Sequence, residues 1–249
     1  GYGKIRAAWT QVGNEAFAYG TATPYFLSAP FTTAAGSILN RATLGDRLGN
    51  ANLVNELTTE LEFGADLRFF RNRVGVDFTY FYRKSTDQIT AAQVPSSSGF
   101  TEAVVNAGEI DNKGIEVSLN LVPVKTASGL EWNTTVNFTR IRSLIVDAGE
   151  GGDIFIGGLT GGGGGTIHRT GYPYGQIFGD KNARTPEGDI LIDKTLGTTI
   201  ILPDLQIIGD PNPDFLFSFI NNFSFKGFNL NALIDWRQGG DMYLTTAGS

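Results

Sequence analysis

The sequence contains no cysteine, one histidine and one methionine among its 249 residues. Without cysteine, the chain can form neither a disulfide framework nor a thiolate metal site. No apolar run approaches the roughly 18 residues of a membrane-spanning helix. The formal net charge is −6 and there is no basic block, which argues against nucleic-acid binding. The length suits one large β domain or two small ones.

The chain is rich in glycine and phenylalanine, with 33 and 18 residues respectively. This balance is typical of many strands and turns with aromatic faces. Hydrophobic residues make up 41% of the chain, so its composition is not that of a disordered protein. The missing apolar helix does not exclude a membrane protein, because the strands of a transmembrane barrel hide their hydrophobicity in alternation.

Two segments on either side of residues 71–73 alternate apolar and polar residues. A period of two places apolar side chains on one face of each strand and polar ones on the other. The polar positions carry the charged residues Glu62, Asp66, Arg68, Asp77 and Arg83. In a soluble sheet the apolar face meets a protein core, whereas in an outer-membrane barrel it meets lipid and the charged face lines a wet lumen.

The same pattern predicts seven strands, at residues 3–12, 58–70, 73–90, 108–122, 129–143, 213–225 and 227–239. The alternation has exceptions. Phe81, Leu216, Ile220 and Leu233 fall at polar positions, and Asn221 falls at an apolar one.

Short and long connections alternate strictly along the chain. The short ones are residues 71–73, 123–128 and 226–227, and the long ones are 13–57, 91–107 and 144–212. All short turns therefore lie at one end of the sheet and all long loops at the other, which is the plan of a bacterial outer-membrane barrel. A soluble β-sandwich remains the alternative, although long loops without structure are uncommon in compact domains. The glycine run at 161–165 predicts a flexible loop.

The side chains that usually carry catalysis or bind metal do not form a recognisable constellation. His168 has no partner at catalytic or zinc spacing, so a solvated loop histidine is expected. The acidic stretch 180–193 is better explained by a turn at 186–189 than by a calcium loop. The strand carboxylates Asp66, Asp77, Glu116 and Asp235 suggest no catalytic pair. We expect no enzyme activity and no cofactor.

Four stretches resemble one family, the SusC/RagA-type TonB-dependent outer-membrane transporters. Residues 106–116, NAGEIDNKGIE, resemble its NxGxIxNKGxE stretch, and residues 62–73 resemble its ExGxDxRFFxNR hairpin. Residues 208–215, IGDPNPDF, are similar to its GNPNPDF motif, and residues 6–14 to its RASYGQVGN strand.

The resemblance implies an all-β fold in which this chain, residues 1–249, is an antiparallel transmembrane β-barrel segment: about seven strands from the later part of a larger plugged barrel of about 22 strands. The chain begins within a strand and trails off in a polar loop at 241–249, and we expect it to be a piece of a longer protein. By resemblance the complete protein lies in the outer membrane of a Gram-negative bacterium and imports oligosaccharides or peptides. A SusD-like surface lipoprotein, a TonB–ExbB–ExbD complex acting on the plug, and outer-membrane lipid are its expected partners.

The resemblance also suggests roles for two sets of residues. The first set is expected to face the lumen, where it holds the plug in preference to touching cargo: Asp66, Arg68, Asp77, Arg83, Glu116, Asp235 and Arg237. The second set is expected in the long loops, where it contacts cargo or the lid, or packs the loops together: Tyr19, Tyr25, Phe26, Phe100, Phe155, His168, Tyr172 and Tyr174. A glycan-binding β-sandwich and a structural outer-membrane protein without transport are the alternative functions.

Overall fold

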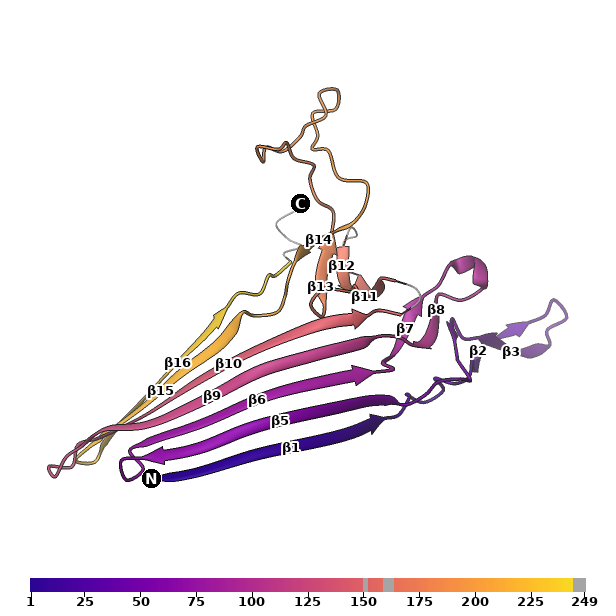
Figure 1. Cartoon of the computed structure of the whole chain (residues 1–249). Coiled ribbons are helices and arrows are strands. Elements are labelled where there is room, and N and C mark those ends of the chain that lie inside the picture. The colour runs from indigo at the N-terminus through magenta and orange to yellow at the C-terminus, as the bar shows by residue number, and fades with distance from the viewer. Residues whose placement is uncertain (150–151, 159–163, 244–249) are drawn as a thin grey trace.

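The computed structural model describes residues 1–149, 152–158 and 164–243, and its main feature is one curved sheet of seven long antiparallel strands (Figure 1). In spatial order the strands are β1 (Tyr2–Asn14), β5 (Glu56–Phe69), β6 (Val74–Thr86), β9 (Glu109–Lys125), β10 (Glu131–Asp147), β15 (Phe215–Phe225) and β16 (Phe228–Gln238). The seven predicted strands are confirmed. Within the described ranges, no helix is long and apolar enough to cross a membrane.

Strand register gives the sheet two chemically different faces. One row of paired positions is Ile5, Ala65, Phe78, Val117, Phe138, Phe217 and Trp236. The adjacent row is Arg6, Gly64, Thr79, Glu116, Thr139, Leu216 and Arg237. Because neighbouring residues of a strand point to opposite sides, these rows belong to an apolar face and a polar face, and these two names are used below.

The apolar band slants across the sheet relative to the strand pairing. On β6 the apolar face remains aromatic up to Tyr82, whose partner on β9 is Lys113 and whose next neighbour on β10 is Arg142. On β10 the apolar band ends earlier, at Phe138, because the next two residues on the apolar face are Arg140 and Arg142. At the opposite end, the band continues furthest on β15 and β16, to the paired Phe225 and Phe228. A band that slants across paired strands is expected where strands are tilted to a barrel axis.

The three short turns lie at one end of the sheet (Figure 1). Between β5 and β6, Phe70, Arg71 and Asn72 adopt φ angles of 52°, 56° and 66°. Between β15 and β16, Lys226 and Gly227 have φ of 46° and 91°. Two positive φ values in a two-residue loop are typical of a type I′ hairpin, whose twist matches that of the strands.

The third short turn differs from the prediction. Residues 123–128 were expected to form it, but β9 continues to Lys125 and the turn spans 126–130. A register shift between Trp132 and Thr134 places a β-bulge opposite Asn133, where Val122 and Pro123 lie. A bulge is one of the few places where a strand tolerates proline, because no ladder donor is needed there.

Two of the exceptions to alternation have partners that explain them. Phe81 lies on the polar face above Gly114, where an added Cβ would collide with the phenylalanine ring. Asn221 lies on the apolar face, where its side-chain oxygen accepts a hydrogen bond of 3.0 Å from the Trp132 indole nitrogen. A buried amide is tolerated on such a face when it is hydrogen-bonded.

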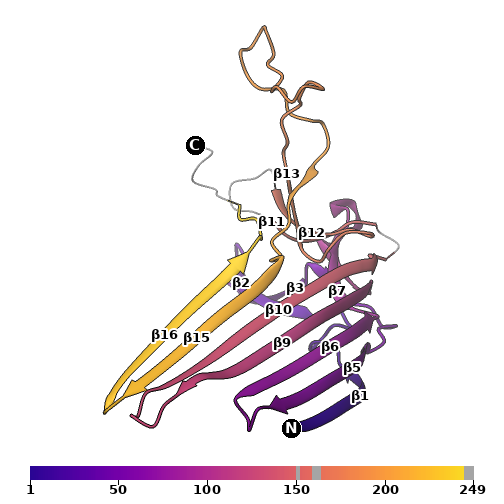
Figure 2. The ribbon, with the colours of Figure 1, turned by 60° about the vertical axis from the view of Figure 1, so that its left-hand side comes forward.

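The long loops contain more structure than expected. They form a hairpin of β2 (Tyr25–Thr32) and β3 (Ile38–Leu44), and a sheet of β4 (Arg47–Leu48), β8 (Glu102–Asn106) and β7 (Ile89–Gln93). A third sheet joins β11 (Ile154–Gly158), β12 (Gly164–His168), β13 (Gln176–Gly179) and β14 (Gln206–Gly209). Figure 2 shows these elements gathered at the loop end of the large sheet.

Two further expectations about loops need revision. The strand predicted at 73–90 ends at Thr86, because Asp87 adopts a φ of 56° and interrupts the strand before β7 begins. Of the glycine run predicted as a flexible loop, residues 161–163 lie outside the described residues, while Gly164 and Gly165 begin β12.

The expected turn at 186–189 is confirmed. The Thr185 backbone nitrogen donates to the Asp189 carbonyl at 2.8 Å, and Arg184 pairs with Ile190. The surrounding segment projects away from the large sheet (Figure 1).

Among the described residues, the core cluster lies where the loops meet the polar face. Ile110 of β9 and Ile145 of β10 lie on the polar face and pack with Ala148 and with Ile154 of β11. This cluster anchors the third loop sheet to the large sheet.

Candidate functional site

The polar face is held together by a charge network that crosses three strands. The Arg6 guanidinium on β1 donates to both carboxylate oxygens of Asp77 on β6, at 3.1 and 2.9 Å, and to the Thr79 hydroxyl at 2.6 Å. Its Nε lies 3.6 Å from the Glu62 carboxylate. To reach β6, the arginine side chain passes over Gly64 on β5, where an added Cβ would meet the guanidinium. The network therefore requires glycine at position 64, because any side chain there would occupy the space that the Arg6 guanidinium fills.

Two other basic residues of the polar face are also paired with carboxylates. Arg83 Nε lies 2.5 Å from Glu60, and Arg68 Nε lies 3.3 Å from Asp66. These pairs match opposite charges across or along the strands, and in a partly solvated setting each contributes modestly to stability.

The seven residues predicted to face a lumen share the polar face, as their register requires. They do not form one site. Asp66 and Asp77 are cross-strand partners, whereas Asp235 and Arg237 line a separate cavity between β10, β15 and β16. Arg237 donates a 2.7 Å hydrogen bond to the Pro211 carbonyl. Their proposed contact with a plug stays a prediction.

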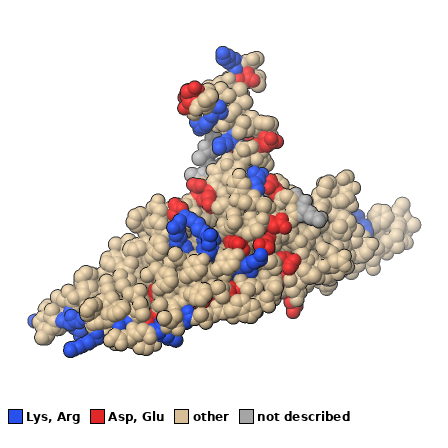
Figure 3. Space-filling view, viewed as in Figure 1, with Lys and Arg blue, Asp and Glu red and all other residues tan. Residues whose placement is uncertain are grey.

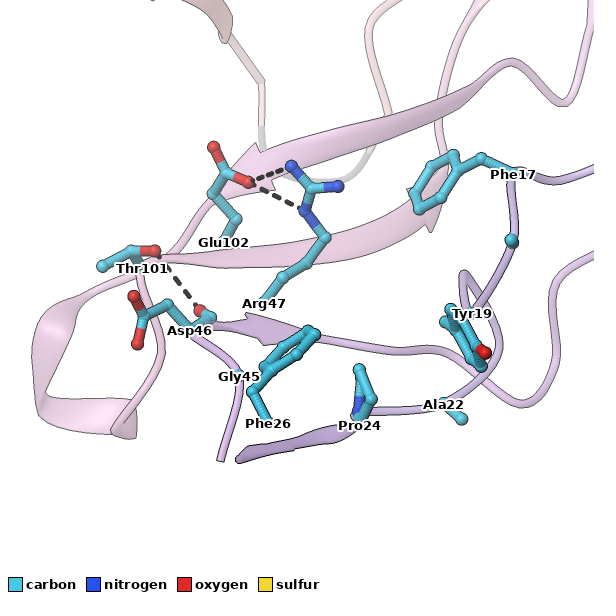
Figure 4. Close-up of a pocket in the computed structure, with 11 residues that line it drawn as sticks. Phe17, Tyr19, Ala22, Pro24, Phe26, Gly45, Asp46, Arg47, Thr101 and Glu102 are labelled. Atoms are coloured by element: carbon cyan, nitrogen blue, oxygen red, sulfur yellow. Dashed lines mark hydrogen bonds and ion pairs between the residues drawn. The ribbon is translucent and has the colours of Figure 1, made fainter. Parts of the chain in front are cut away.

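The loop end carries a cavity of about 320 Å³ with one aromatic and one charged side (Figure 4). Phe17, Tyr19 and Phe26 supply the aromatic side, and the paired Arg47 and Glu102 supply much of the other. Arg47 Nε and Nη2 lie 2.9 and 2.8 Å from one Glu102 oxygen, and the guanidinium carbon lies 5.4 Å from the centre of the Phe17 ring. Aromatic faces beside paired polar groups suit a ligand with both apolar faces and hydrogen-bonding edges.

Sequence reasoning found only part of this cavity. Tyr19 and Phe26 were candidates and do line it; their exposed fractions are 74% and 59%. Tyr25 and Phe100 were also candidates but are not among its lining residues. Phe17, Arg47 and Glu102 were missed, because the ion pair joins positions 55 residues apart in the chain and no local pattern marks it.

The remaining loop candidates lie around the third loop sheet. Phe155 packs edge-on against Phe178, with ring centres 5.0 Å apart, and also borders a larger cavity of about 890 Å³. The Tyr172 carbonyl accepts a hydrogen bond from the Ile145 backbone nitrogen, and its ring lies 6.0 Å from the Arg169 guanidinium carbon. For Phe155 and Tyr172, therefore, the structure records packing contacts within the loops.

His168 is not the solvated loop residue that was expected. It lies in β12, packs against Tyr174 in a tilted arrangement with ring centres 4.1 Å apart, and borders a small cavity of about 140 Å³. Within the described part of the chain its Nε2 is buried without a hydrogen-bond partner. Burial lowers the pKa of His168 from 6.5 to about 4, so the imidazole is neutral at pH 7.

We expect acid to loosen the third loop sheet through His168. In the folded state its pKa lies below the unfolded value, so the unfolded state binds the proton more readily. The stability contribution is present above about pH 6.5 and is lost as the pH falls from 6.5 towards 4. Amide hydrogen exchange in residues 164–179, corrected for its intrinsic pH dependence, should be faster at pH 5 than at pH 7. His168→Phe should remove this difference while keeping an aromatic ring packed against Tyr174, and an unchanged difference in that variant would contradict the role of His168.

Elsewhere outside the strands of the large sheet, two loop charges are held by local partners. The Asp193 carboxylate accepts hydrogen bonds from the backbone nitrogens of Thr195 and Leu196, which lower its pKa. The Asp153 carboxylate binds Arg169 through both oxygens and raises the pKa of that guanidinium. Across residues 1–149, 152–158 and 164–243, no three His, Asp or Glu side chains converge as a metal site.

Comparison with known proteins connects this architecture to one family. Residues 3–247 match the family described as "TonB dependent receptor-like, beta-barrel". TonB-dependent receptor P3 of Formosa agariphila is 28% identical over 267 residues, an alignment that covers 96% of this chain and 26% of that protein. TonB-dependent receptor SusC of Bacteroides thetaiotaomicron is 27% identical over 197 residues, covering 73% of this chain and 19% of that protein. The chain thus spans about a quarter or less of the length of these curated relatives.

A solved structure shows the same fold. A chain of the RagAB peptide importer in its closed-closed state superposes with a TM-score of 0.74 at 19% identity, over 96% of this chain and 27% of that one. At this identity the likeness concerns the fold alone. The match of residues 3–247 to a β-barrel family identifies the large sheet as barrel wall, and the β-sandwich alternative is wrong.

Proposed function

Because this chain belongs to the TonB-dependent receptor-like β-barrel family, we propose that it forms part of the wall of an outer-membrane importer of the SusC type. The complete protein would carry oligosaccharides or peptides, with a SusD-like lipoprotein over the loops and a TonB–ExbB–ExbD complex supplying force to a plug. The names of similar proteins support this assignment: one relative is the TonB-dependent receptor SusC, and one solved structure of the same fold is described as a peptide importer.

The separation of the two faces is the observation that carries this proposal. An apolar face whose band slants across the strands and ends in aromatic residues suits contact with lipid. A polar face with paired charges suits a wet lumen. The polar-face charges Arg6, Asp77 and Glu62 satisfy one another. We therefore propose that this face presents a fixed lumen surface to the plug, and that cargo selectivity lies in the loops, where rigid strands position variable segments.

Uptake by the complete protein tests this assignment. In cells that express it, uptake of the cargo should stop when the inner-membrane proton gradient is dissipated, because a plugged barrel has no energy source of its own. Binding of cargo at the cell surface should persist under the same conditions. Uptake that continues without the gradient would favour the alternative of a passive or structural outer-membrane protein.

The aromatic side of the loop cavity should affect cargo affinity. We expect Tyr19→Ala and Phe26→Ala each to raise the cargo concentration for half-maximal uptake by roughly fivefold, since a lost aromatic contact costs about 1 kcal/mol. Tyr25→Ala is the matched control: Tyr25 is an equally exposed aromatic next to Phe26, but it does not line the cavity. Equal effects of all three substitutions would indicate general loop disturbance instead of a binding cavity.

A further inference from the structure

We propose that Lys113 and Arg140, with Arg142 beside them, form a binding site for a phosphorylated lipid headgroup of the outer leaflet. This site depends on one part of the proposed function, namely that the apolar face meets the membrane. It concerns the outside of the barrel wall, and it assigns a ligand that is neither cargo, plug nor lid.

The three basic residues lie on the apolar face, at the loop end of the apolar band. Lys113 is paired with Arg142 across β9 and β10, and Arg140 is paired with Ile115. On each strand, the next apolar-face residue toward the middle of the sheet still belongs to the apolar band: it is Ile115 on β9 and Phe138 on β10. The first charged groups above the band on these two strands are cationic, and the next apolar-face residue on β9, Asp111, accepts a 2.7 Å hydrogen bond from the Tyr82 hydroxyl. Figure 3 shows basic side chains, with acidic ones among them, near the base of the loops, and basic side chains again at the end with the short turns.

Ion pairs form on both faces, and each face also has cations without one among the described residues; on the polar face these are Lys4 and Arg237. On the polar face, Arg6, Arg68 and Arg83 each have a carboxylate partner within 3.6 Å. On the apolar face, Arg142 pairs with Asp214 at 2.9 Å, and Lys84 pairs with Glu109 at 2.6 Å. For Lys113 and Arg140, no carboxylate lies within ion-pair distance in the described part of the chain. Both side chains are exposed. Two unmatched cations facing outward at the edge of a lipid-facing band complement an anionic headgroup layer.

The geometry also favours a lipid over a free anion. The alkyl stems of lysine and arginine can lie along apolar surface while their charges reach the headgroup level. Ile115 and Phe138 continue the apolar surface below the cations, so one ligand can place acyl chains on the band and a phosphate on the charges. Inorganic phosphate would use only the second of these contacts.

The test uses the complete protein, extracted from outer membranes, and measures the lipid A that remains bound per protein by mass spectrometry. We expect Lys113→Gln/Arg140→Gln to bind added phosphorylated lipid A roughly thirty-fold more weakly than the unsubstituted protein, since two cations near an anionic surface together contribute about 2 kcal/mol. Arg71→Gln/Arg73→Gln is the matched control, because it removes two positive charges from a turn at the other end of the band and should retain the lipid. The charge-preserving Lys113→Arg/Arg140→Lys should also retain it, and heat-modifiable migration on a detergent gel checks that every variant is folded.

Three results would overturn the proposal: equal lipid retention in Lys113→Gln/Arg140→Gln and the unsubstituted protein, equal affinity for dephosphorylated lipid A, or full competition by inorganic phosphate. The last would point to a free-anion site instead. Uptake is measured in parallel, so the two proposals can fail separately. A protein that retains lipid A but imports nothing contradicts the import proposal alone, and one that imports cargo without retaining lipid A contradicts this one alone.

Discussion

The substitution Leu119→Arg is expected to destabilise the complete barrel by about 2–4 kcal/mol, which is the cost of placing a cation on a lipid-facing surface near the bilayer midplane. Leu119 lies on the apolar face of β9, midway between Ile115 and Val124 along that strand, and is paired with Val76 and Val136 on the neighbouring strands. Among the described residues, the apolar-face rows on either side of Leu119 on β6, β9 and β10 contain no carboxylate. The measurement is the free energy of unfolding in denaturant, with the barrel refolded into lipid vesicles.

Asn120→Arg is the matched control for this substitution, because it places the same side chain one residue further along the same strand. Asn120 lies on the polar face, is exposed, and accepts a 2.9 Å hydrogen bond from the Thr135 hydroxyl. A wet lumen can solvate arginine, so the expected loss is only that of one exposed hydrogen bond, about 1 kcal/mol or less. If Asn120→Arg were the more damaging substitution, the two faces would have to be exchanged.

The substitution Gly64→Val is expected to destabilise the barrel by about 1–3 kcal/mol through overpacking. Two effects oppose each other at this position. Replacing glycine within a strand normally favours folding, because glycine loses the most conformational freedom and packs no side chain. Here an added Cβ meets the Arg6 guanidinium, which must leave Asp77 and Thr79 or force the strands apart. Because the clash involves a side chain held by three hydrogen bonds, we expect it to outweigh the gain in strand propensity.

Gly75→Val separates these two effects. Gly75 also lies on the polar face, on β6, but there an added Cβ would be 3.6 Å from the nearest atom, the Asn120 Cβ, which is an ordinary contact. This substitution should be neutral or slightly stabilising in the same unfolding experiment. In addition, Arg6→Ala should relieve most of the Gly64→Val penalty in the double variant, because the clash disappears with the guanidinium. Additive losses in that double variant would contradict the proposed crossing of Arg6 over Gly64.

The large sheet was predictable because alternation and connection length are local properties of the chain. Seven strands and the sidedness of their turns follow from a period of two and from three short links. The shape of the loops was not predictable in this way. Their small sheets pair segments such as β4 with β8 and β13 with β14, which are distant in sequence and carry weak alternation of their own. His168 was misplaced for the same reason, since its burial depends on Tyr174 and on a strand that begins within a glycine run.

The sequence alone determined which side chains share a face along the regular parts of the strands, because neighbouring residues there point to opposite sides; the bulge at Val122 and Pro123 interrupts this pattern. Only the tertiary structure decided which residues meet across strands. The register places Arg6 over Gly64 and beside Asp77, and the loop pairing brings Arg47 to Glu102 and to the face of the Phe17 ring. Such contacts depend on strand register and on loop closure over tens of residues, and neither can be predicted from a local sequence pattern.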